Sequence, residues 1–318
     1  MFLYNLTDKN GIKNCLEENG VVGILNVLNK EEIQKTINCI ELLIQKECKS
    51  DNFKFNNYDS YSLTDNLMNN YGVIGKQALF EDQLIKNRYN PNIQEAYSIA
   101  YNLDKNEIFP HHDRVGWMRP TIGPNSEDWS KYKVPFNKPG LHLDISPNGY
   151  FDPKYSQNVY QFLNNLEYKN IEDLIRENNA KNIIMGKHYT GVLNLLDNEE
   201  EDGGFHCILG GHKIVEEWYK NSKNLLPKAE PNGRYIINFD NSADLKYFNE
   251  PTTRIICPAG TLLIFDITLP HGTKPNYSNN SRLIQFLKYS PINMFNKKTF
   301  LKRENFLIKI YSKLNPFL

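Results

Sequence analysis

The feature that most constrains the fold is a seven-residue segment, LHLDISP, that begins at Leu141. In this segment the apolar residues Leu141, Leu143 and Ile145 alternate with His142 and Asp144. Successive side chains of a β-strand point to opposite faces of the sheet. The segment is therefore predicted to be a half-buried strand whose imidazole and carboxylate emerge together on the face away from the apolar core.

A second polar segment, LPHGTKPNYSNNSR, lies much later in the chain and carries His271 and Arg282. Two imidazoles and one carboxylate on one side of a metal, with the other positions open, form the facial triad of non-haem Fe(II) oxygenases. His142, Asp144 and His271 are accordingly predicted to be metal ligands and catalytic residues. Arg282 can hold a dicarboxylate through two parallel hydrogen bonds, which a lysine ammonium cannot do.

A competing pair with the same spacing, His111 and Asp113, occurs in IFPHHDRVGWMRP. The residues around this pair do not alternate with apolar ones, and a proline precedes it. A ligand-bearing strand is therefore less strongly indicated here than in LHLDI. We expect Asp113 to form a structural ion pair with Arg114 or Arg119. The alternative is that Arg114 or Arg119 contacts a carboxylate or phosphate of a substrate.

Strand-like and helix-like segments alternate along the chain. A chain of 318 residues exceeds the usual single domain, yet β-rich domains of roughly 200–250 residues are common. The sequence therefore predicts one domain, mainly β with flanking helices (α+β), in which residues 1–107 give helical support with early strands and residues 291–318 form a helical extension. Predicted strands are residues 21–28, 188–197, 261–266 and 282–290; predicted helices are residues 7–19, 29–44, 92–103, 171–177 and 214–226.

A long connection, about residues 148–187, interrupts the strand pattern directly after the first two predicted ligands. Such an excursion is well placed to cover a site, and Tyr150 is then a candidate substrate contact. A surface-packed insertion is the alternative. The acidic run at 199–202 is expected to be a solvated turn, because calcium loops need alternating ligands.

The net charge limits the kinds of partner that we expect, and the cysteine pattern indicates the cellular compartment. The 37 basic and 37 acidic residues give a net charge of zero, so nucleic acid is a disfavoured partner and a small molecule is the expected substrate, with a protein substrate as a further option. Five dispersed cysteines without a CxxC pair indicate a reducing compartment. Lacking a long apolar run or a signal segment, the chain is predicted to be cytoplasmic, soluble and free of membrane spans. The sequence leaves the oligomeric state open.

Taken together, the motifs resemble the phytanoyl-CoA dioxygenase family of the Fe(II)/2-oxoglutarate-dependent oxygenases. The resemblance covers roughly residues 10–290 and is carried by the ordered set of HxD at 142–144, DGGFHCILGGHK, PAGTLLIF and HGTKPNYSNNSR. It implies a double-stranded β-helix (jelly-roll, cupin-like) core over residues 108–290, with the insertion at about 148–187. Retention of Asp144 distinguishes the chain from halogenase variants of the superfamily.

The resemblance also implies an activity. An oxidoreductase of this kind uses Fe(II), 2-oxoglutarate and O2 to hydroxylate a C–H bond and releases succinate and CO2. Arg282, assisted by Thr273, is then expected to bind 2-oxoglutarate; Asn194 is either another co-substrate contact or a hydrogen-bonded core residue. Two other classes stay open at this point, namely a non-catalytic jelly-roll binding module and a metal-dependent hydrolase or isomerase.

Overall fold

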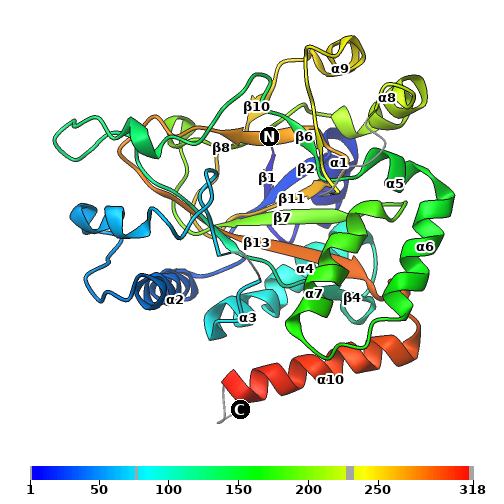
Figure 1. The fold of residues 1–318 in the computed structure, drawn as a ribbon, viewed down its shortest axis with the longest axis horizontal. Coiled ribbons are helices and arrows are strands. Elements are labelled where there is room, and N and C mark those ends of the chain that lie inside the picture. The colour runs from blue at the N-terminus through cyan, green and yellow to red at the C-terminus, as the bar shows by residue number, and fades with distance from the viewer. Residues whose placement is uncertain (1, 76–77, 227–232, 315–318) are drawn as a thin grey trace.

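Two β-sheets face each other in the computed structural model, which describes residues 2–75, 78–226 and 233–314 (Figure 1). The larger sheet contains β1 (Leu3–Tyr4), β2 (Val21–Ile24), β3 (Val73–Ile74), β4 (Ile108–Pro110), β5 (Val115–Met118), β7 (Tyr189–Asn194), β11 (Leu262–Asp266) and β13 (Arg282–Pro291). The smaller sheet contains β6 (His142–Leu143), β8 (Gly204–Cys207), β9 (Tyr235–Ile236), β10 (Thr253–Arg254) and β12 (His271–Lys274). The fold is mixed α/β, and both sheets take part in forming its interior.

Strands that are far apart in the sequence lie side by side in both sheets. The larger sheet has the order β1-β2-β11-β7-β13-β5-β3, with β4 also paired to β13, and the smaller has the order β10-β8-β12-β6-β9. The predicted strands at 188–197, 261–266 and 282–290 are thus the three central strands of the larger sheet, β7, β11 and β13. The HxD strand is only two residues long in β6, yet its side chains alternate as predicted, because Leu141, Leu143 and Ile145 are buried in the core.

The side chains of β13 point alternately into the apolar core on one face of the larger sheet and into a cavity on the other face. Leu283, Leu287 and Tyr289 pack in the apolar cluster shared with the N-terminal helices. The alternating residues line a cavity between the sheets: Arg282, Ile284, Phe286 and Lys288. A period of two along one strand therefore assigns each side chain either to the core or to the cavity.

Four helices cover the outer face of the larger sheet: α1 (Lys9–Asn19), α2 (Lys30–Cys48), α3 (Asp82–Arg88) and α4 (Pro91–Tyr101). The predicted capping box of α2 is present, since the Asn29 side chain accepts from Glu32 N–H and the Glu32 carboxylate accepts from Asn29 N–H. Helix α1 ends at Gly20, whose φ of 76° suits a left-handed cap. The helices predicted at 7–19, 29–44 and 92–103 are confirmed.

The connection between β6 and β7 is helical and packs beside the sheets. It comprises α5 (Pro147–Phe151), α6 (Pro153–Asn164) and α7 (Ile171–Ala180). Helices α6 and α7 pack with the last helix, α10 (Lys297–Leu314), in one apolar cluster (Figure 1), whereas Tyr150 and Phe151 of α5 belong to the cluster of the smaller sheet. A fully buried ion pair joins α7 to α10, with 2.8 Å between Glu177 Oε2 and Arg303 Nε. Helix α6 was not predicted from the sequence, although Val159, Tyr160 and Leu163 lie at helical spacing and pack in this cluster.

Two more helices, α8 (Val215–Ser222) and α9 (Ser242–Phe248), cover the outer side of the smaller sheet, with Trp218 buried between them as expected. Within the described residues, every helix is too short or too polar to cross a bilayer.

Candidate metal centre

The smaller sheet brings the three predicted ligands together. His271, the first residue of β12, lies directly opposite His142 of β6 in the antiparallel register, and Asp144 follows two residues after His142. Their ligand atoms all lie within 4.8 Å of one another. His142 Nε2 is 3.5 Å from Asp144 Oδ1, and His271 Nε2 is 3.9 Å from Asp144 Oδ2. Cis ligands of a metal with bonds near 2.1 Å lie about 3 Å apart, so small side-chain movements suffice for coordination.

The backbone around the triad fixes its orientation. His271 Nδ1 lies 2.8 Å from the carbonyl of Leu269 and donates to it, which leaves Nε2 as the free lone pair for a metal. Asp144 N–H donates to the carbonyl of Ile267 at 3.1 Å. At Gly272 an added Cβ would meet the Gly140 carbonyl, so the two ligand-bearing strands approach this closely only with a glycine there.

Electrostatics keep Asp144 and His271 in the protonation states that a metal needs. Burial would raise the pKa of Asp144, but the hydrogen bond from His142 and the charges of His271, His142 and Lys288 hold this pKa well below its usual value. Burial and the neighbouring His142 lower the pKa of His271 to about 3. A carboxylate and a neutral imidazole are the forms that bind a divalent cation.

Arg282 lies on the opposite sheet, at the start of β13, and is buried to 5% exposure. Its Nε has no hydrogen-bond acceptor, and Nη1 contacts only the Met118 sulfur at 3.8 Å. Burial and the like charge of Arg254 lower the pKa of Arg282 to about 9. Gly204 on β8 makes room for the guanidinium, since a Cβ there would lie 2.6 Å from Arg282 Nε. A buried cation without an anionic partner among the described residues could hold the carboxylate of a ligand.

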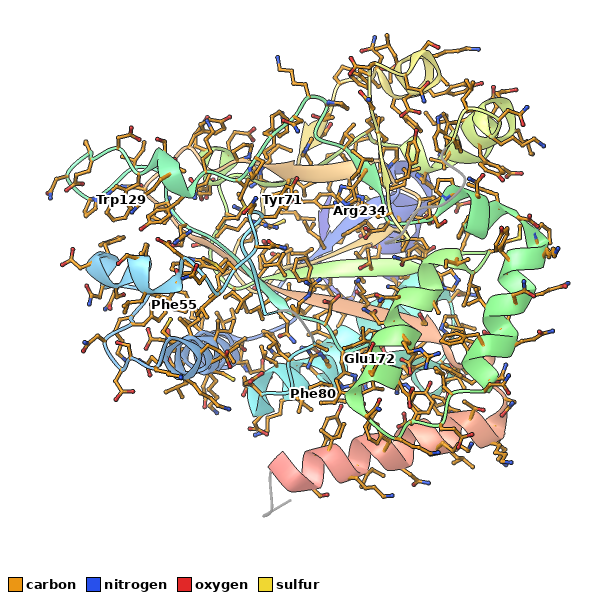
Figure 2. All side chains as sticks on the ribbon, viewed as in Figure 1. Phe55, Tyr71, Phe80, Trp129, Glu172 and Arg234 are labelled. Carbon is orange, nitrogen blue, oxygen red and sulfur yellow. The ribbon has the colours of Figure 1, made fainter. Side chains whose placement is uncertain are left out.

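The triad and Arg282 open into one cavity of about 840 Å³, which both sheets line. Two of its exposed lining residues are labelled in Figure 2: Tyr71, just before β3, and Arg234, just before β9. These strands are the terminal strands of the two sheets, so the mouth of the cavity opens between the sheet edges. Thr273, two residues after His271 on β12, also lines the cavity.

The competing HxD pair does not form a metal site with the triad. His111 Nε2 bonds Ser290 Oγ at 2.8 Å, and its other ring nitrogen faces the buried Glu177 at 3.1 Å. Asp113 pairs with Lys288 at 2.9 Å and with Arg114 Nε at 3.3 Å. The predicted ion pair of Asp113 with Arg114 is present, while Lys288 is a partner that the sequence did not suggest.

Three of the predicted contact residues lie elsewhere. Arg119 bonds Asp65 at 2.5 Å and stacks over the Tyr132 ring at 3.7 Å, so its charge is already paired. Tyr150 donates its hydroxyl to the Gly186 carbonyl. The Asn194 amide lies 3.4 Å from the Thr261 carbonyl, which favours a hydrogen-bonded core residue over a co-substrate contact. These three residues are absent from the described cavity lining.

The helical connection also stands apart from the cavity, because residues 148–187 contribute nothing to the described lining. Its packing against α10 supports the surface-packed insertion rather than a cover. Instead, the cavity is lined by residues 135–138, which precede β6, and by residues 236–238, which begin at the last residue of β9. Arg114, by contrast with Arg119 and Tyr150, does line it.

One residue that supports the loop before Arg282 was not predicted from the sequence. Asp202, within the acidic run expected to be a solvated turn, is 1% exposed. Its carboxylate accepts from Ser278 Oγ at 2.7 Å and Asn280 Nδ2 at 3.1 Å, so it anchors the loop that leads into Arg282. The clustering of Ser and Asn in that loop was the available signal, since such side chains need buried acceptors when a loop is ordered.

Comparisons with known proteins bear on this site. Residues 179–284 match the family model described as phytanoyl-CoA dioxygenase (PhyH). A curated protein of Dictyostelium discoideum, provisionally described as a phytanoyl-CoA dioxygenase, is 29% identical over 294 residues, which make up 91% of this chain and 77% of that protein. The matched segment contains His271 and Arg282, whereas His142 and Asp144 precede it. The tertiary structure therefore places two residues from outside the matched segment beside His271.

Two solved structures are similar in fold. GlcNAc inducible gene 2 of Candida albicans has a TM-score of 0.55 at 14% identity, and the match covers 91% of this chain and 66% of that protein, just under two thirds of its length. The epimerase SnoN, solved with Fe3+, alpha ketoglutarate and nogalamycin RO, has a TM-score of 0.51 at 13% identity, with coverage of 90% and 84%. At such identities the similarity is one of fold.

Proposed function

From the match of residues 179–284 to the phytanoyl-CoA dioxygenase family model, the similarity to the curated relative and the candidate ligand triad, we propose that this chain is a member of that family and an Fe(II)- and 2-oxoglutarate-dependent dioxygenase. The proposed reaction hydroxylates a C–H bond of a small molecule and releases succinate and CO2. The two facing sheets fit a double-stranded β-helix core of the jelly-roll, cupin-like type, which holds such a centre between its sheets.

The observation that carries the proposal is the unpaired Arg282 facing the same cavity as the triad. An isolated buried guanidinium is unfavourable unless a ligand supplies the missing anion. In 2-oxoglutarate the keto-acid end chelates a metal and the distal carboxylate is free for such a cation, a bidentate match for arginine. The triad and Arg282 thus fit the two ends of this co-substrate.

The residues of the chain divide the remaining work. His142, Asp144 and His271 would hold the iron on one side and leave its other positions open to the cavity. Thr273, close to the metal on the cavity face of β12, would assist Arg282 in orienting the co-substrate. When bound, iron and 2-oxoglutarate supply the activation of O2. The apolar walls of the cavity, among them Phe265 and Phe286, restrict water around the reacting centre.

Conversion of 2-oxoglutarate to succinate, followed in the presence of Fe(II) with and without O2, tests the proposal. We expect succinate formation that requires both iron and O2 and that falls at least 100-fold in His142→Ala. Arg282→Ala should chiefly raise the apparent KM for 2-oxoglutarate, because it removes a binding group and leaves the metal ligands in place. His212→Ala serves as a matched control, since His212 bonds the Glu17 carbonyl outside the cavity.

The same assay separates the other classes. Turnover of a substrate without O2 would indicate a hydrolase or isomerase that uses the triad with another metal. Binding of metal and small molecules with no turnover after a broad substrate screen would indicate a binding module. Full turnover by His271→Ala would refute the triad itself.

A further inference from the structure

Strand β13 presents a cation to the cavity at each end of its inner face. Arg282 and Lys288 both line the cavity, with Ile284 and Phe286 between them. Six residues of a strand span about 20 Å, so the two cations serve different parts of the cavity. In the proposed function, 2-oxoglutarate occupies the Arg282 end. The Lys288 end is left for the molecule that is oxidised.

The segment between β4 and β5 carries two further charged residues to this end. The backbone is held on both sides of it, because His111 N–H donates to the Lys288 carbonyl at 2.8 Å and Phe286 N–H donates to the Arg114 carbonyl at 3.2 Å. The buried guanidinium of Arg88 also donates to the Asp113 carbonyl at 2.7 Å. Asp113 and Arg114 are therefore fixed where their side chains line the cavity.

The charges in this cluster are not balanced. Asp113 is the single carboxylate that pairs with two cations, Lys288 at 2.9 Å and Arg114 at 3.3 Å through Nε. The terminal nitrogens of Arg114 have no acceptor in the part of the chain that the structure describes, and its side chain is 36% exposed. One positive charge and a set of planar donors thus remain for a ligand.

The cluster also lies beside the metal centre. Asp113, Arg114 and Lys288 line the same cavity as the three residues of the triad. Val192, Phe265 and Phe286 supply apolar wall to the same cavity. A molecule with an acid group at Arg114 would therefore have an apolar body within the same enclosure as the triad.

We propose that Arg114 and Lys288 form a second anion site and that the substrate is a small organic acid whose carboxylate or phosphate binds there. Asp113 is a positioning residue that holds both cations. This inference rests on the proposed function, because it assigns the substrate to the cavity of the same metal centre.

Calorimetric titration of the protein loaded with Mn(II) and saturating 2-oxoglutarate tests the anion site without turnover. The probes share one chain length and differ in the head group: hexanoate, hexyl phosphate and the neutral hexanamide. We expect at least one acid to bind about tenfold or more tightly than the amide, which is what a charge-assisted hydrogen bond contributes. The better acid identifies whether carboxylate or phosphate is preferred.

Variants locate the preference. Arg114→Gln should reduce it to within about twofold, and so should the double variant Asp113→Asn/Lys288→Met, which removes both charges of the buried pair and avoids leaving either one unpaired. Arg176→Gln, on the exposed side of α7, makes the same substitution far from the cavity and should retain the preference. If Arg234→Gln at the mouth abolishes the preference and Arg114→Gln does not, the proposed site is wrong.

The anion site would be refuted if hexanoate and hexyl phosphate bound no more tightly than hexanamide. It would equally be refuted if none of the three probes bound. The titrations also separate this outcome from failure of the proposed function. If 2-oxoglutarate does not bind to the Mn(II) protein, the proposed function fails. If it binds and the acids are not preferred, only the anion site is rejected.

Discussion

Replacing Arg282 with methionine is expected to stabilise the ligand-free protein and to abolish its stabilisation by 2-oxoglutarate. The guanidinium is 5% exposed and has no carboxylate partner in the described residues. Burial, together with the like charge of Arg254, lowers the pKa of Arg282 to about 9. At about 1.4 kcal/mol per pH unit, a lowering of this size corresponds to a destabilisation on the order of 5 kcal/mol.

The net gain should be smaller, because methionine loses some packing and the ligand-free cavity admits water. Substituting apolar residues for buried charges commonly stabilises proteins by about 1–4 kcal/mol, and we expect Arg282→Met to fall in this range. The folded-state pKa of this base lies below its unfolded value, so the destabilisation is fully present below pH 9 and declines as the pH rises above it. Measurements near pH 7.5 therefore record the whole effect.

Urea unfolding with Mn(II), with and without 2-oxoglutarate, provides the assay. A ligand at 100 times its Kd should add about 2.7 kcal/mol to the wild type and almost nothing to the variant. Arg119→Met is the matched control: Arg119 is paired with Asp65, so its loss should destabilise the protein slightly and leave the 2-oxoglutarate effect intact. A ligand-free Arg282→Met protein less stable than the wild type, or one still stabilised by 2-oxoglutarate, would refute the reasoning.

Three further predictions concern single residues. His271→Ala should weaken Mn(II) binding at least 100-fold, measured by electron paramagnetic resonance of the free ion, because one of three protein ligands is lost. Gly204→Ala should weaken 2-oxoglutarate binding about tenfold and destabilise the protein by about 1–3 kcal/mol, since a Cβ would displace Arg282 and the φ of +113° disfavours alanine. Glu177→Gln should destabilise the protein by up to about 3 kcal/mol at pH 7, because it removes the buried carboxylate that pairs with Arg303 and leaves the partly exposed Glu304 as the remaining anionic partner. Although burial opposes it, the charge of Arg303 and the hydrogen bond from His111 lower the pKa of Glu177 to about 2, so the wild type should lose this stability as the pH falls from about 4.5 towards 2 and the variant should not, in urea titrations across that range.

The sequence predicted those parts of the site that local periodicity controls. Alternation in LHLDI put His142 and Asp144 on one face, and the structure keeps that alternation although only two residues are in strand β6. The capping box at Asn29 likewise determined where α2 begins. In each case the physical cause lies within a few residues of chain, so no distant contact was needed to see it.

Contacts between distant segments could not be predicted in the same way. Lys288 and Asp113 are far apart in the sequence, and only the pairing of β4 and β5 with β13 brings them to 2.9 Å. Lys288 lies an even number of residues after Arg282 on β13, so strand alternation predicts that both side chains point to the same face of the sheet. Arg119 carried no such signal, because its pairing with Asp65 depends on the fold of the N-terminal region.

The sequence by itself determined the chemistry available to this protein: two imidazoles, a carboxylate and an arginine in an order that resembles one family, on strands with one polar face. The tertiary structure decided which of these residues lie together around the cavity. Strand pairing placed His271 opposite His142, and burial left Arg282 without a carboxylate partner among the described residues. Helices α6 and α7 of the long insertion pack against α10, and the insertion contributes nothing to the described lining of the cavity. Residue types set which bonds can form, whereas the register and packing of distant strands set which of them are left for a ligand.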